Sequence, residues 1–276
     1  MRKTLSAYPY LVWAVLFILV PLFLVAYFGF TVEQEDGSFT FSLENFKAFF
    51  TSPIYMQALW RSVWMAAVAT AICLLIGYPA AYFLAGSTFK NKGLLIMLLV
   101  IPMWMNLLLR TYAWVIVLDT KGLLNTVLGY IGIGPVDFLY ETHSIIFGMV
   151  YNFLPFMILP IHSVLVKMDN SLIEAAQDLG APPSRVFFKV TLPMSMPGIL
   201  SGISMVFMPA VTTFAISDIL SGKKIQLMGN VIEQKFLLAD DWNFGSAMSL
   251  VLMVLIIITM LLSSKADKNG EGGGLL

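Results

Sequence analysis

Charged residues divide this sequence into long apolar intervals. Six intervals contain no Asp, Glu, Lys or Arg, and they cover residues 4–32, 62–89, 93–109, 142–166, 190–217 and 242–264. A helix needs about 20 predominantly apolar residues to cross a bilayer. The pattern therefore predicts an all-α integral membrane protein with six transmembrane helices.

The third interval is the shortest, because Arg110 interrupts it. The next charge, Asp119, lies about 13 Å further along a helix at 1.5 Å per residue. A long arginine side chain can extend toward the interface while its stem stays in apolar surroundings. We predict one helix over residues 94–118, with the Arg110 guanidinium reaching the outer surface.

The polar connections set the orientation and the domain boundaries. The short segment that holds Lys90 and Lys92 contains no acidic residue, and basic loops tend to stay in the cytoplasm. With six spans, both termini are then predicted to be cytoplasmic. Residues 1–57 are predicted to form the first transmembrane helix and an external segment with an interfacial helix over 42–50. Residues 58–264 form the transmembrane core, and 265–276 a disordered cytoplasmic tail.

Composition supports a protein embedded in membrane lipid. Hydrophobic residues make up 59% of the chain and charged residues 12%, whereas soluble domains contain about 25% charged residues. The net charge is zero and no Lys/Arg-rich run occurs, which argues against a nucleic-acid partner. Cys73 is the single cysteine, so a disulfide within the chain is excluded, and we expect it to be a small buried apolar residue.

The sequence contains no recognisable catalytic motif. The phosphate-binding pattern GxxxxGK[ST] is missing, as are HExxH and GxSxG. His143 and His162 would be about 28 Å apart along the fourth span, which is too far to share a metal ion. We therefore predict a transport protein rather than an enzyme, with no catalytic residue, no metal site and no cofactor bound by this chain.

The segment between spans four and five is charged but patterned for structure. Ser171-Leu-Ile-Glu174 fits a capping box, which predicts a short helix that begins there. Gly180 can adopt the positive φ that ends such a helix. Pro182 and Pro183 can open a second short helix, and Pro193 is predicted to stop it before the fifth span.

These residues carry a family resemblance. Glu174-Ala175-Ala176, Gly180 and Leu192-Pro193 resemble the EAA motif of binding-protein-dependent ABC importer permeases, at that family's spacing. The resemblance implies a type I importer permease fold whose cytoplasmic coupling helix, in a loop over 167–195, docks in a cleft of a separate ATPase. The residues assigned to coupling are Glu174, Ala175, Ala176, Asp178, Gly180, Leu192 and Pro193. The loop also fits a capped interfacial turn without a partner.

The resemblance further implies partners and a location. The expected partners are an ATP-binding cassette ATPase dimer that binds ATP and Mg, a second permease subunit, and an extracytoplasmic binding protein, at the bacterial cytoplasmic membrane. Segments 77–85, 109–114, 120–125, 154–160, 217–222, 229–236 and 241–245 are similar to the polyamine-type subgroup, which imports spermidine and putrescine. Asn243 stands where that subgroup is expected to have proline, and we expect a looser turn there.

Acidic and aromatic residues near the outer ends of the spans fit a cationic cargo. Carboxylates attract a polyammonium chain, and aromatic rings contribute cation–π contacts of about 0.5–2 kcal/mol. The candidate pathway residues are Asp218, Arg110, Tyr112, Trp114, Tyr151, Glu233, Asp240, Asp241 and Trp242. Two other interpretations stay open: the aromatic residues also fit interfacial anchors, and Asp218 also fits an ion pair with Arg110.

Other functional classes remain as alternatives. The chain could be an ABC permease for another small solute. A secondary transporter would carry ion-coupling groups near the middle of the membrane, yet the middle of each apolar interval has almost no ionisable residue. A membrane enzyme would need clustered catalytic side chains within the spans, which the pattern does not provide.

Overall fold

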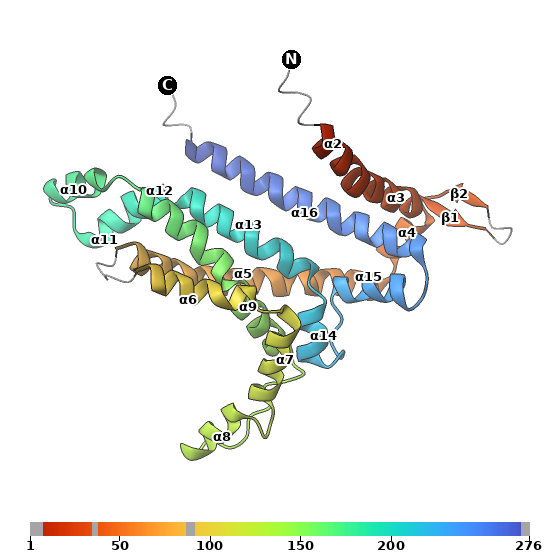
Figure 1. Cartoon of the computed structure of the whole chain (residues 1–276), viewed down its shortest axis with the longest axis horizontal. Helices are drawn as coiled ribbons and strands as arrows, with labels where there is room; N and C mark the ends of the chain where they lie inside the picture. The colour runs from red at the N-terminus through yellow and green to blue at the C-terminus, as the bar shows by residue number, and fades with distance from the viewer. Residues whose placement is uncertain (1–7, 35–37, 87–91, 272–276) are drawn as a thin grey trace.

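The computed structural model describes residues 8–34, 38–86 and 92–271, and these residues are almost entirely helical (Figure 1). The exception is a two-stranded antiparallel hairpin that pairs Thr31 with Phe41 and Glu33 with Phe39. The elements in chain order are α2 (Tyr8–Ala14), η1 (Val15–Leu19), α3 (Val20–Gly29), β1 (Thr31–Glu33), β2 (Phe39–Phe41), α4 (Glu44–Thr51), α5 (Pro53–Gly86), α6 (Lys92–Trp104), α7 (Leu107–Leu118), α8 (Leu123–Tyr130), α9 (Thr142–Lys167), α10 (Asn170–Asp178), α11 (Pro183–Val186), η2 (Phe187–Thr191), α12 (Leu192–Met194), α13 (Met196–Thr212), α14 (Ala215–Ser221), α15 (Met228–Leu237) and α16 (Trp242–Glu271).

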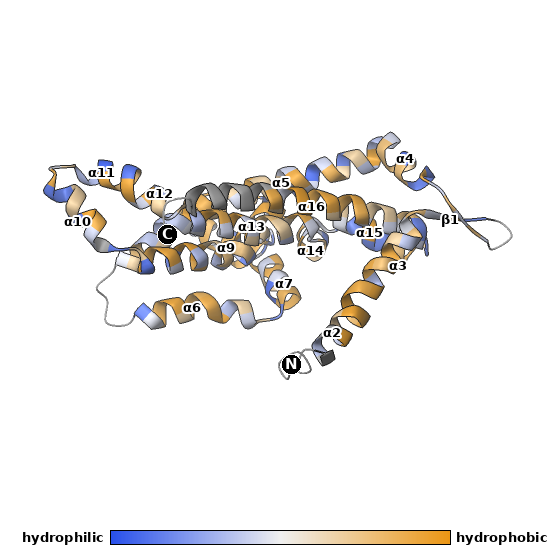
Figure 2. Ribbon diagram, turned by 90° about the horizontal axis from the view of Figure 1, so that it is seen from above, coloured by the Kyte–Doolittle hydropathy of each residue, from blue (hydrophilic) through white to orange (hydrophobic). Residues whose placement is uncertain are grey.

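Four described helices are long and apolar enough to cross a membrane, and two bent helix pairs raise the number to six if each pair forms one span. The single helices are Val12–Gly29, Pro53–Gly86, Thr142–Lys167 and Trp242–Leu261. Figure 2 shows hydrophobic helices between two ends, with hydrophilic residues at α10 and α11 at one end and near α15 at the other. This arrangement agrees with the predicted six-span membrane protein.

The third span is not the single helix that was predicted over residues 94–118. It is divided between α6 and the segment Leu107–Tyr130, which contains α7 and α8, and the two parts are bent by 97°. Pro102 lies close to the break, and the Asn106 side chain caps α7 by accepting hydrogen bonds from the backbone N–H groups of Leu108 (2.8 Å) and Leu109 (3.3 Å). An asparagine cap supplies what the first turn of a new helix needs. The two helices therefore form a broken span.

The ends of the fifth and sixth spans also differ from the prediction. The helix does not stop at Pro193 but passes through η2 and α12 and bends by 60° at Ser195. Pro193 lies inside this continuous helical run, in α12 directly before the bend. α16 continues to Glu271, so residues 265–271 are helical rather than part of a disordered tail. Residues 272–276 and Lys90 lie outside the described residues.

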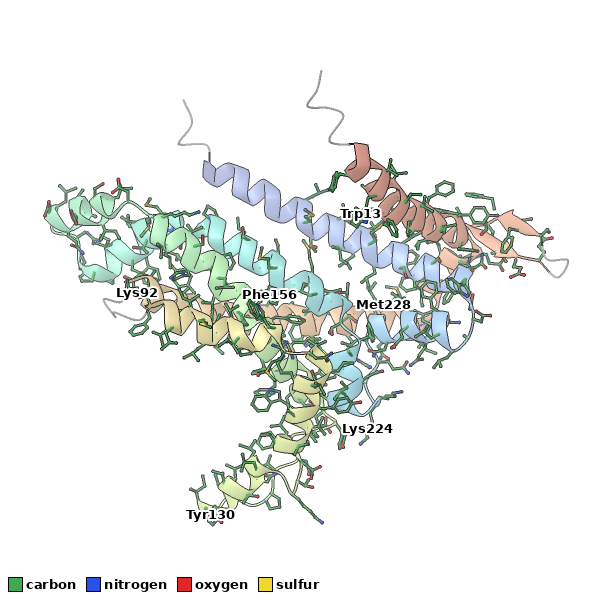
Figure 3. The ribbon with its side chains drawn as sticks, viewed as in Figure 1. Trp13, Lys92, Tyr130, Phe156, Lys224 and Met228 are labelled. Carbon is green, nitrogen blue, oxygen red and sulfur yellow. The ribbon has the colours of Figure 1, made fainter. Side chains whose placement is uncertain are left out.

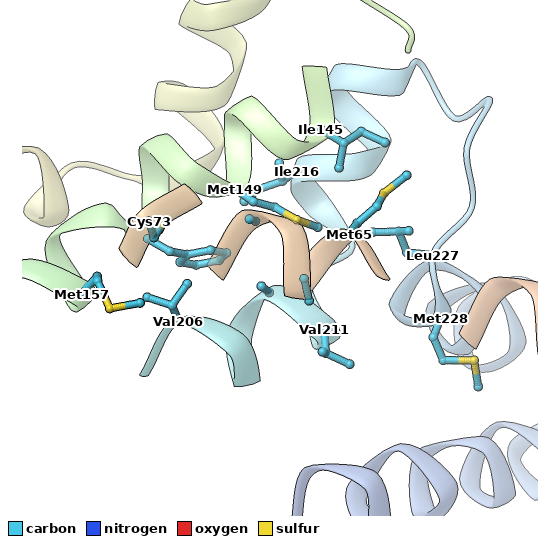
Figure 4. Packing of buried hydrophobic residues seen from close by; sticks show 14 of the residues in the cluster. Met65, Cys73, Ile145, Met149, Met157, Val206, Val211, Ile216, Leu227 and Met228 are labelled. Atoms are coloured by element: carbon cyan, nitrogen blue, oxygen red, sulfur yellow. The ribbon is translucent and has the colours of Figure 1, made fainter. Parts of the chain in front are cut away.

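The core lies where α5, α9 and α13 pack together (Figure 4). Met157 of α9 is held between two glycines: a Cβ on Gly77 of α5 would lie 3.0 Å from its Cγ, and one on Gly202 of α13 would lie 2.7 Å from its Sδ. Small residues permit such close helix approach in membranes, where packing rather than water exclusion joins helices. Cys73 is buried in this core, as predicted.

The segment before the second span contains a helix where an interfacial one was predicted, shifted by about two residues. α4 begins at Glu44, and the Ser42 hydroxyl accepts a hydrogen bond from the Glu44 N–H at 3.1 Å. Asn243 does not loosen its turn, because its side-chain amide donates to the carbonyl oxygens of Thr31 (2.7 Å) and Phe28 (3.1 Å). These bonds join the start of α16 to the end of α3.

The α7–α8 arm projects away from the helix bundle (Figure 1). Tyr130 lies near its tip and is exposed (Figure 3). At the start of α8, Asn125 donates to the carbonyl oxygens of Asp119 and Val136, both at 3.0 Å. These bonds hold α8 to the end of α7 and to the segment that leads back to α9, and the far end of the arm lies free of the rest of the chain.

Candidate functional site

The predicted coupling helix forms, but a different residue caps it. α10 covers Asn170–Asp178, and its N-cap is Asp169, whose carboxylate accepts a hydrogen bond from the Ser171 N–H at 2.9 Å. The prediction that Ser171 caps the helix was wrong by two residues. Hydrogen bonding to Ser171 lowers the pKa of the Asp169 carboxyl below its usual range, because the bond favours the charged form.

The predicted end of α10 at Gly180 is confirmed. Gly180 has φ +78°, and its N–H donates to the Gln177 carbonyl at 2.8 Å, while the Ala181 N–H donates to the Ala176 carbonyl at 3.1 Å. This pair of bonds is the Schellman motif, which satisfies carbonyls that a helix end leaves open. No atom lies within 4 Å of a Cβ placed on Gly180, so its backbone conformation rather than space requires glycine.

Most side chains of the coupling motif are exposed, whereas Ala176 is half-buried. Glu174, Ala175 and Asp178 are exposed, and Leu179 is 89% exposed. Neither carboxylate makes a hydrogen bond or ion pair with another described residue. α10 is thus held by its own caps and by packing on α11 and η2, and its outer face is unpartnered within the described chain.

The coupling loop is joined to two spans by contacts that the sequence analysis missed. The Phe187 ring lies edge-on to Tyr78 (5.8 Å) and Tyr82 (5.6 Å) of α5. The Tyr78 hydroxyl is 2.9 Å from the Ser195 hydroxyl, which donates to the Leu192 carbonyl at 2.9 Å. Since that bond uses the Ser195 proton, Tyr78 is the donor in its own bond to Ser195. Tyr78 and Ser195 are polar residues inside otherwise apolar intervals, and this pattern could have indicated that they bond to each other.

At the opposite end, Asp218 belongs to a buried polar network. Its carboxylate accepts from the Asn230 amide at 2.6 Å, and Asn230 is only 1% exposed. The Asn230 side-chain oxygen accepts from the Ser217 hydroxyl (2.7 Å) and from the Leu227 N–H (2.9 Å). The Met228 N–H donates to Ser62 of α5 at 2.7 Å, which ties the start of α15 to the second span. The sequence analysis did not single out Asn230 or Ser62.

Arg110 does not reach the outer surface, and it does not pair with Asp218 within the described chain. Its side chain is 8% exposed, and its guanidinium donates to the Pro102 carbonyl at 2.5 Å and lies 5.8 Å from the centre of the Tyr151 ring. The Trp114 ring packs edge-on against Tyr151 at 5.0 Å. The sharp bend between α6 and α7 brings Arg110 back onto the end of α6, so its role is to hold the break.

The other pathway candidates lie in separate places. Asp241 forms an ion pair with Lys235 at 3.2 Å, and the Trp242 indole donates to Asp240 at 2.7 Å. Tyr112 is exposed on α7. Glu233 lines a cavity beside α13 and α16 and makes no hydrogen bond or ion pair with another described residue. The structure therefore does not gather the candidates into one site.

A metal centre finds no support in the described residues. Within 8–34, 38–86 and 92–271, no group of three His, Cys, Asp or Glu side chains is placed to hold a metal ion. Buried methionines such as Met65, Met149 and Met157 fill the helix interfaces instead. This is the role expected of a flexible apolar side chain.

Comparison with known proteins gives a family match and full-length relatives. Residues 74–268 match the family described as binding-protein-dependent transport system inner membrane component. The spermidine/putrescine transport system permease protein PotB of Haemophilus influenzae is 43% identical over 260 residues, which cover 93% of this chain and 91% of that protein. PotB of Escherichia coli is 39% identical over 261 residues, 93% of this chain and 94% of that protein.

Solved structures agree on the fold. A bacterial ABC transporter involved in the import of the acidic polysaccharide alginate has a chain that matches with a TM-score of 0.82 at 15% identity, covering 97% of this chain and 95% of its own length. A chain of the MetNI methionine ABC transporter in an inward-facing conformation matches with a TM-score of 0.58 at 16% identity, over 78% of this chain and 95% of its own.

The matched family region begins within α5 and includes the coupling loop, both bent pairs and α16. The predicted ABC importer permease fold is therefore confirmed. The family name implies a binding protein and an ATPase as partners, and it places the chain in the inner membrane as a multi-pass, non-catalytic component. The chain belongs to the binding-protein-dependent transport system inner membrane components and is the permease component of an ABC importer.

Proposed function

We propose that this chain forms part of the path by which spermidine and putrescine cross the bacterial cytoplasmic membrane. The observation that carries the proposal is the identity of 43% and 39% to two PotB permeases across nearly the whole chain. Relatives with other names are less similar: the permease YdcU of Escherichia coli is 27% identical over 231 residues. The cargo is delivered by an extracytoplasmic polyamine-binding protein and passes between this chain and a second, sister permease.

In this proposal α10 docks on an ATPase dimer, which binds ATP and Mg. Its caps at Asp169 and Gly180 keep the helix rigid, while the exposed Leu179 and Ala175 offer an apolar surface. Movement of α10 is transmitted to α5 through the contact of Phe187 with Tyr78, and to α13 through Ser195. Leu192 and Pro193 lie in α12, between η2 and α13, and are part of the same link between α10 and α13.

We also propose that both termini are cytoplasmic. α16 runs back from the end that carries α15 toward the end that carries α10 (Figure 1). Single cysteines at Gly222 and Ser264 in a Cys73→Ser background test this orientation. An impermeant maleimide should label position 222 and not position 264 in intact cells, and the opposite result contradicts it.

The acids of the outer end give the path its selectivity for cations. Asp218, Asp240 and Asp241 lie on α14 and on the turn before α16, and each is fixed by a partner: Asn230, Trp242 and Lys235. Fixed carboxylates near the outer surface raise the local concentration of a polycation. Salt weakens this effect, because exposed charges are screened over about 8–10 Å at physiological ionic strength.

The decisive experiment measures transport by the assembled complex. This chain, its ATPase, the second permease and the binding protein are reconstituted in vesicles, and uptake of labelled spermidine and putrescine is followed. Both cargoes should accumulate only with ATP, with the binding protein and with an active ATPase. Uptake that persists with an inactive ATPase would instead indicate a secondary transporter. Failure to accumulate either polyamine, in a complex whose ATPase responds to its binding protein, contradicts the proposed cargo.

A further inference from the structure

A cavity of about 500 Å³ lies between the end of α13, α15 and the first half of α16. Ligand cavities in proteins commonly measure about 300–1,000 Å³. Its wall is largely apolar and is formed by Thr212, Phe214, Gly229, Ile232, Glu233, Phe236, Leu237, Ser249, Leu252, Met253 and Ile256. The three helices contact one another around it, so the cavity is part of the folded chain.

The polar side chains in this wall offer acceptors and no free donor. The Thr212 hydroxyl donates to the Met208 carbonyl at 3.1 Å, and the Ser249 hydroxyl donates to the Gly245 carbonyl at 2.9 Å. Each hydroxyl proton is thus committed to its own helix, and only oxygen lone pairs remain. Glu233 adds a carboxylate, which accepts hydrogen bonds when ionised. A ligand that matches this wall is a donor without acceptors, and an alkylammonium group has that property.

Glu233 differs from the other acids at this end of the molecule. Asp218 is bonded to Asn230, Asp240 to Trp242 and Asp241 to Lys235, whereas Glu233 has no hydrogen bond or ion pair with another described residue. The lysine nearest in sequence, Lys235, is engaged by Asp241 and lies over the Phe244 ring at 4.8 Å. The described chain therefore supplies no cation for this carboxylate.

The surroundings of Glu233 favour a cation. The wall around Glu233 is largely apolar, and a charge in such surroundings is costly unless it is paired. The remaining wall, with Leu252, Met253 and Ile256, can contact only apolar groups. The cavity thus combines a cation position with a surface for a short alkyl chain.

We propose that this cavity binds one primary ammonium group of the cargo together with the methylene chain beside it. Glu233 binds the ammonium, and the apolar residues of α16 contact the methylenes. This inference rests on the proposed polyamine function and names its binding site. The amino headgroup of a phosphatidylethanolamine lipid has the same chemistry, so the test must separate the two sources.

Two measurements test the site. The first compares uptake kinetics of the assembled transporter with Glu233→Gln and with Glu33→Gln, an equal charge change on the exposed hairpin outside the cavity. Glu233→Gln should raise the KM for putrescine at least tenfold at unchanged protein level, and Glu33→Gln should change it less than twofold. Equal KM values for Glu233→Gln and the parent chain would overturn the site and leave the polyamine function standing.

The second measurement does not depend on transport. A Ser249→Cys substitution in a Cys73→Ser background places a thiol in the cavity wall, and its labelling by a permeant maleimide is timed in phosphatidylcholine vesicles. Putrescine should slow labelling at least threefold, 1,4-butanediol should not, and Glu233→Gln should abolish the protection. Slowing caused by phosphatidylethanolamine alone, with no effect of putrescine, would assign the cavity to lipid and overturn the proposal. If the parent complex imports neither polyamine while putrescine protects the thiol, the proposed function fails and the ammonium site stands.

Discussion

The two ends of this permease each carry a pair of short helices between spans, and they are stabilised in opposite ways. At the end that we propose to be the outer one, α14 and α15 share a buried network in which Asn230 joins Ser217, Leu227 and Asp218. At the opposite end, proposed to be the inner one, α10 is fixed by its own caps and presents exposed residues such as Leu179 to solvent. The polar groups of the outer pair find their partners within the chain, whereas the exposed face of the inner pair has no partner among the described residues.

This difference follows from what each end must do. A polar group buried without a partner is costly, so a network inside the protein must satisfy all its members. An exposed helix held by local backbone bonds loses little when its outer face is covered or uncovered. The inner pair therefore has the properties of a surface that binds and releases another protein, whereas the outer pair forms a fixed support for the ends of α5 and α13.

The largest effect is expected at Asn230. Asn230→Leu keeps the approximate size but leaves the Leu227 N–H, the Ser217 hydroxyl and the Asp218 carboxylate without their common partner. Each buried unsatisfied group costs about 1–3 kcal/mol, so we expect a loss of about 2–4 kcal/mol, measured by denaturant titration of the purified chain in detergent micelles. The control Gln177→Leu on the exposed α10 should change stability by less than about 0.5 kcal/mol. Equal effects at both sites would remove the contrast between the two ends.

Arg110 gives the next largest effect and tests how the broken span is held. Arg110→Met keeps an apolar stem but removes the bond to the Pro102 carbonyl. A hydrogen bond from a charged group contributes about 1.5–3 kcal/mol, and a loss of that size should appear in the same titration.

The double variant of Arg110→Met with Asp218→Asn distinguishes this role from an ion pair. Because the two side chains have different partners, the stability lost in the double variant should equal the sum of the losses in the two single variants to within about 0.5 kcal/mol. Partial recovery of stability in the double variant would show that the two residues interact after all.

The features predicted best from the sequence are those that depend on residues close together in the chain, such as the ends of helices. The fourth span was predicted over 142–166 and is found at Thr142–Lys167, because charged or polar residues bound it at both ends. Gly180 was predicted to end α10 because the requirement for positive φ is local. The identity of α10's cap was missed, since Asp169 and Ser171 both fit the pattern and only the backbone geometry selects between them.

What the sequence did not predict depends on contacts across the fold. The third span breaks at Asn106, which caps α7. Asn106 is uncharged, so dividing the sequence at its charged residues could not reveal this break. That break redirects Arg110, so its predicted partner was also wrong. Ser62, Tyr78 and Ser195 each take part in a hydrogen bond with a residue that is distant in the sequence. The cavity beside Glu233 exists only where three helices meet.

At the inner end, Gly180→Val should separate coupling from folding. A β-branched residue at φ +78° is strained by about 1–3 kcal/mol, and the end of α10 should relax by changing its backbone. Uptake should fall at least tenfold, while the unfolding midpoint of the spans stays close to that of the parent chain, because no atom lies within 4 Å of a Cβ placed at this position. Gly129→Val, at a glycine with negative φ and no close neighbour, is the control. Normal uptake with Gly180→Val contradicts a rigid coupling helix.

The smallest effect is expected at Asp169, and it depends on pH. The folded pKa of Asp169 is lower than that of a free aspartate, so its cap contributes above the usual carboxyl pKa and is lost as pH falls through the depressed value. Protection of the Ser171 amide, measured by hydrogen exchange and corrected with an unfolded peptide, should be greater in the parent chain than in Asp169→Ala at neutral pH. The difference should disappear in acid, below the depressed pKa. Asp169→Asn, whose amide oxygen can still accept from Ser171, should keep its protection across the whole range. A parent chain that also keeps full protection in acid would show that the charge of Asp169 plays no part in holding α10.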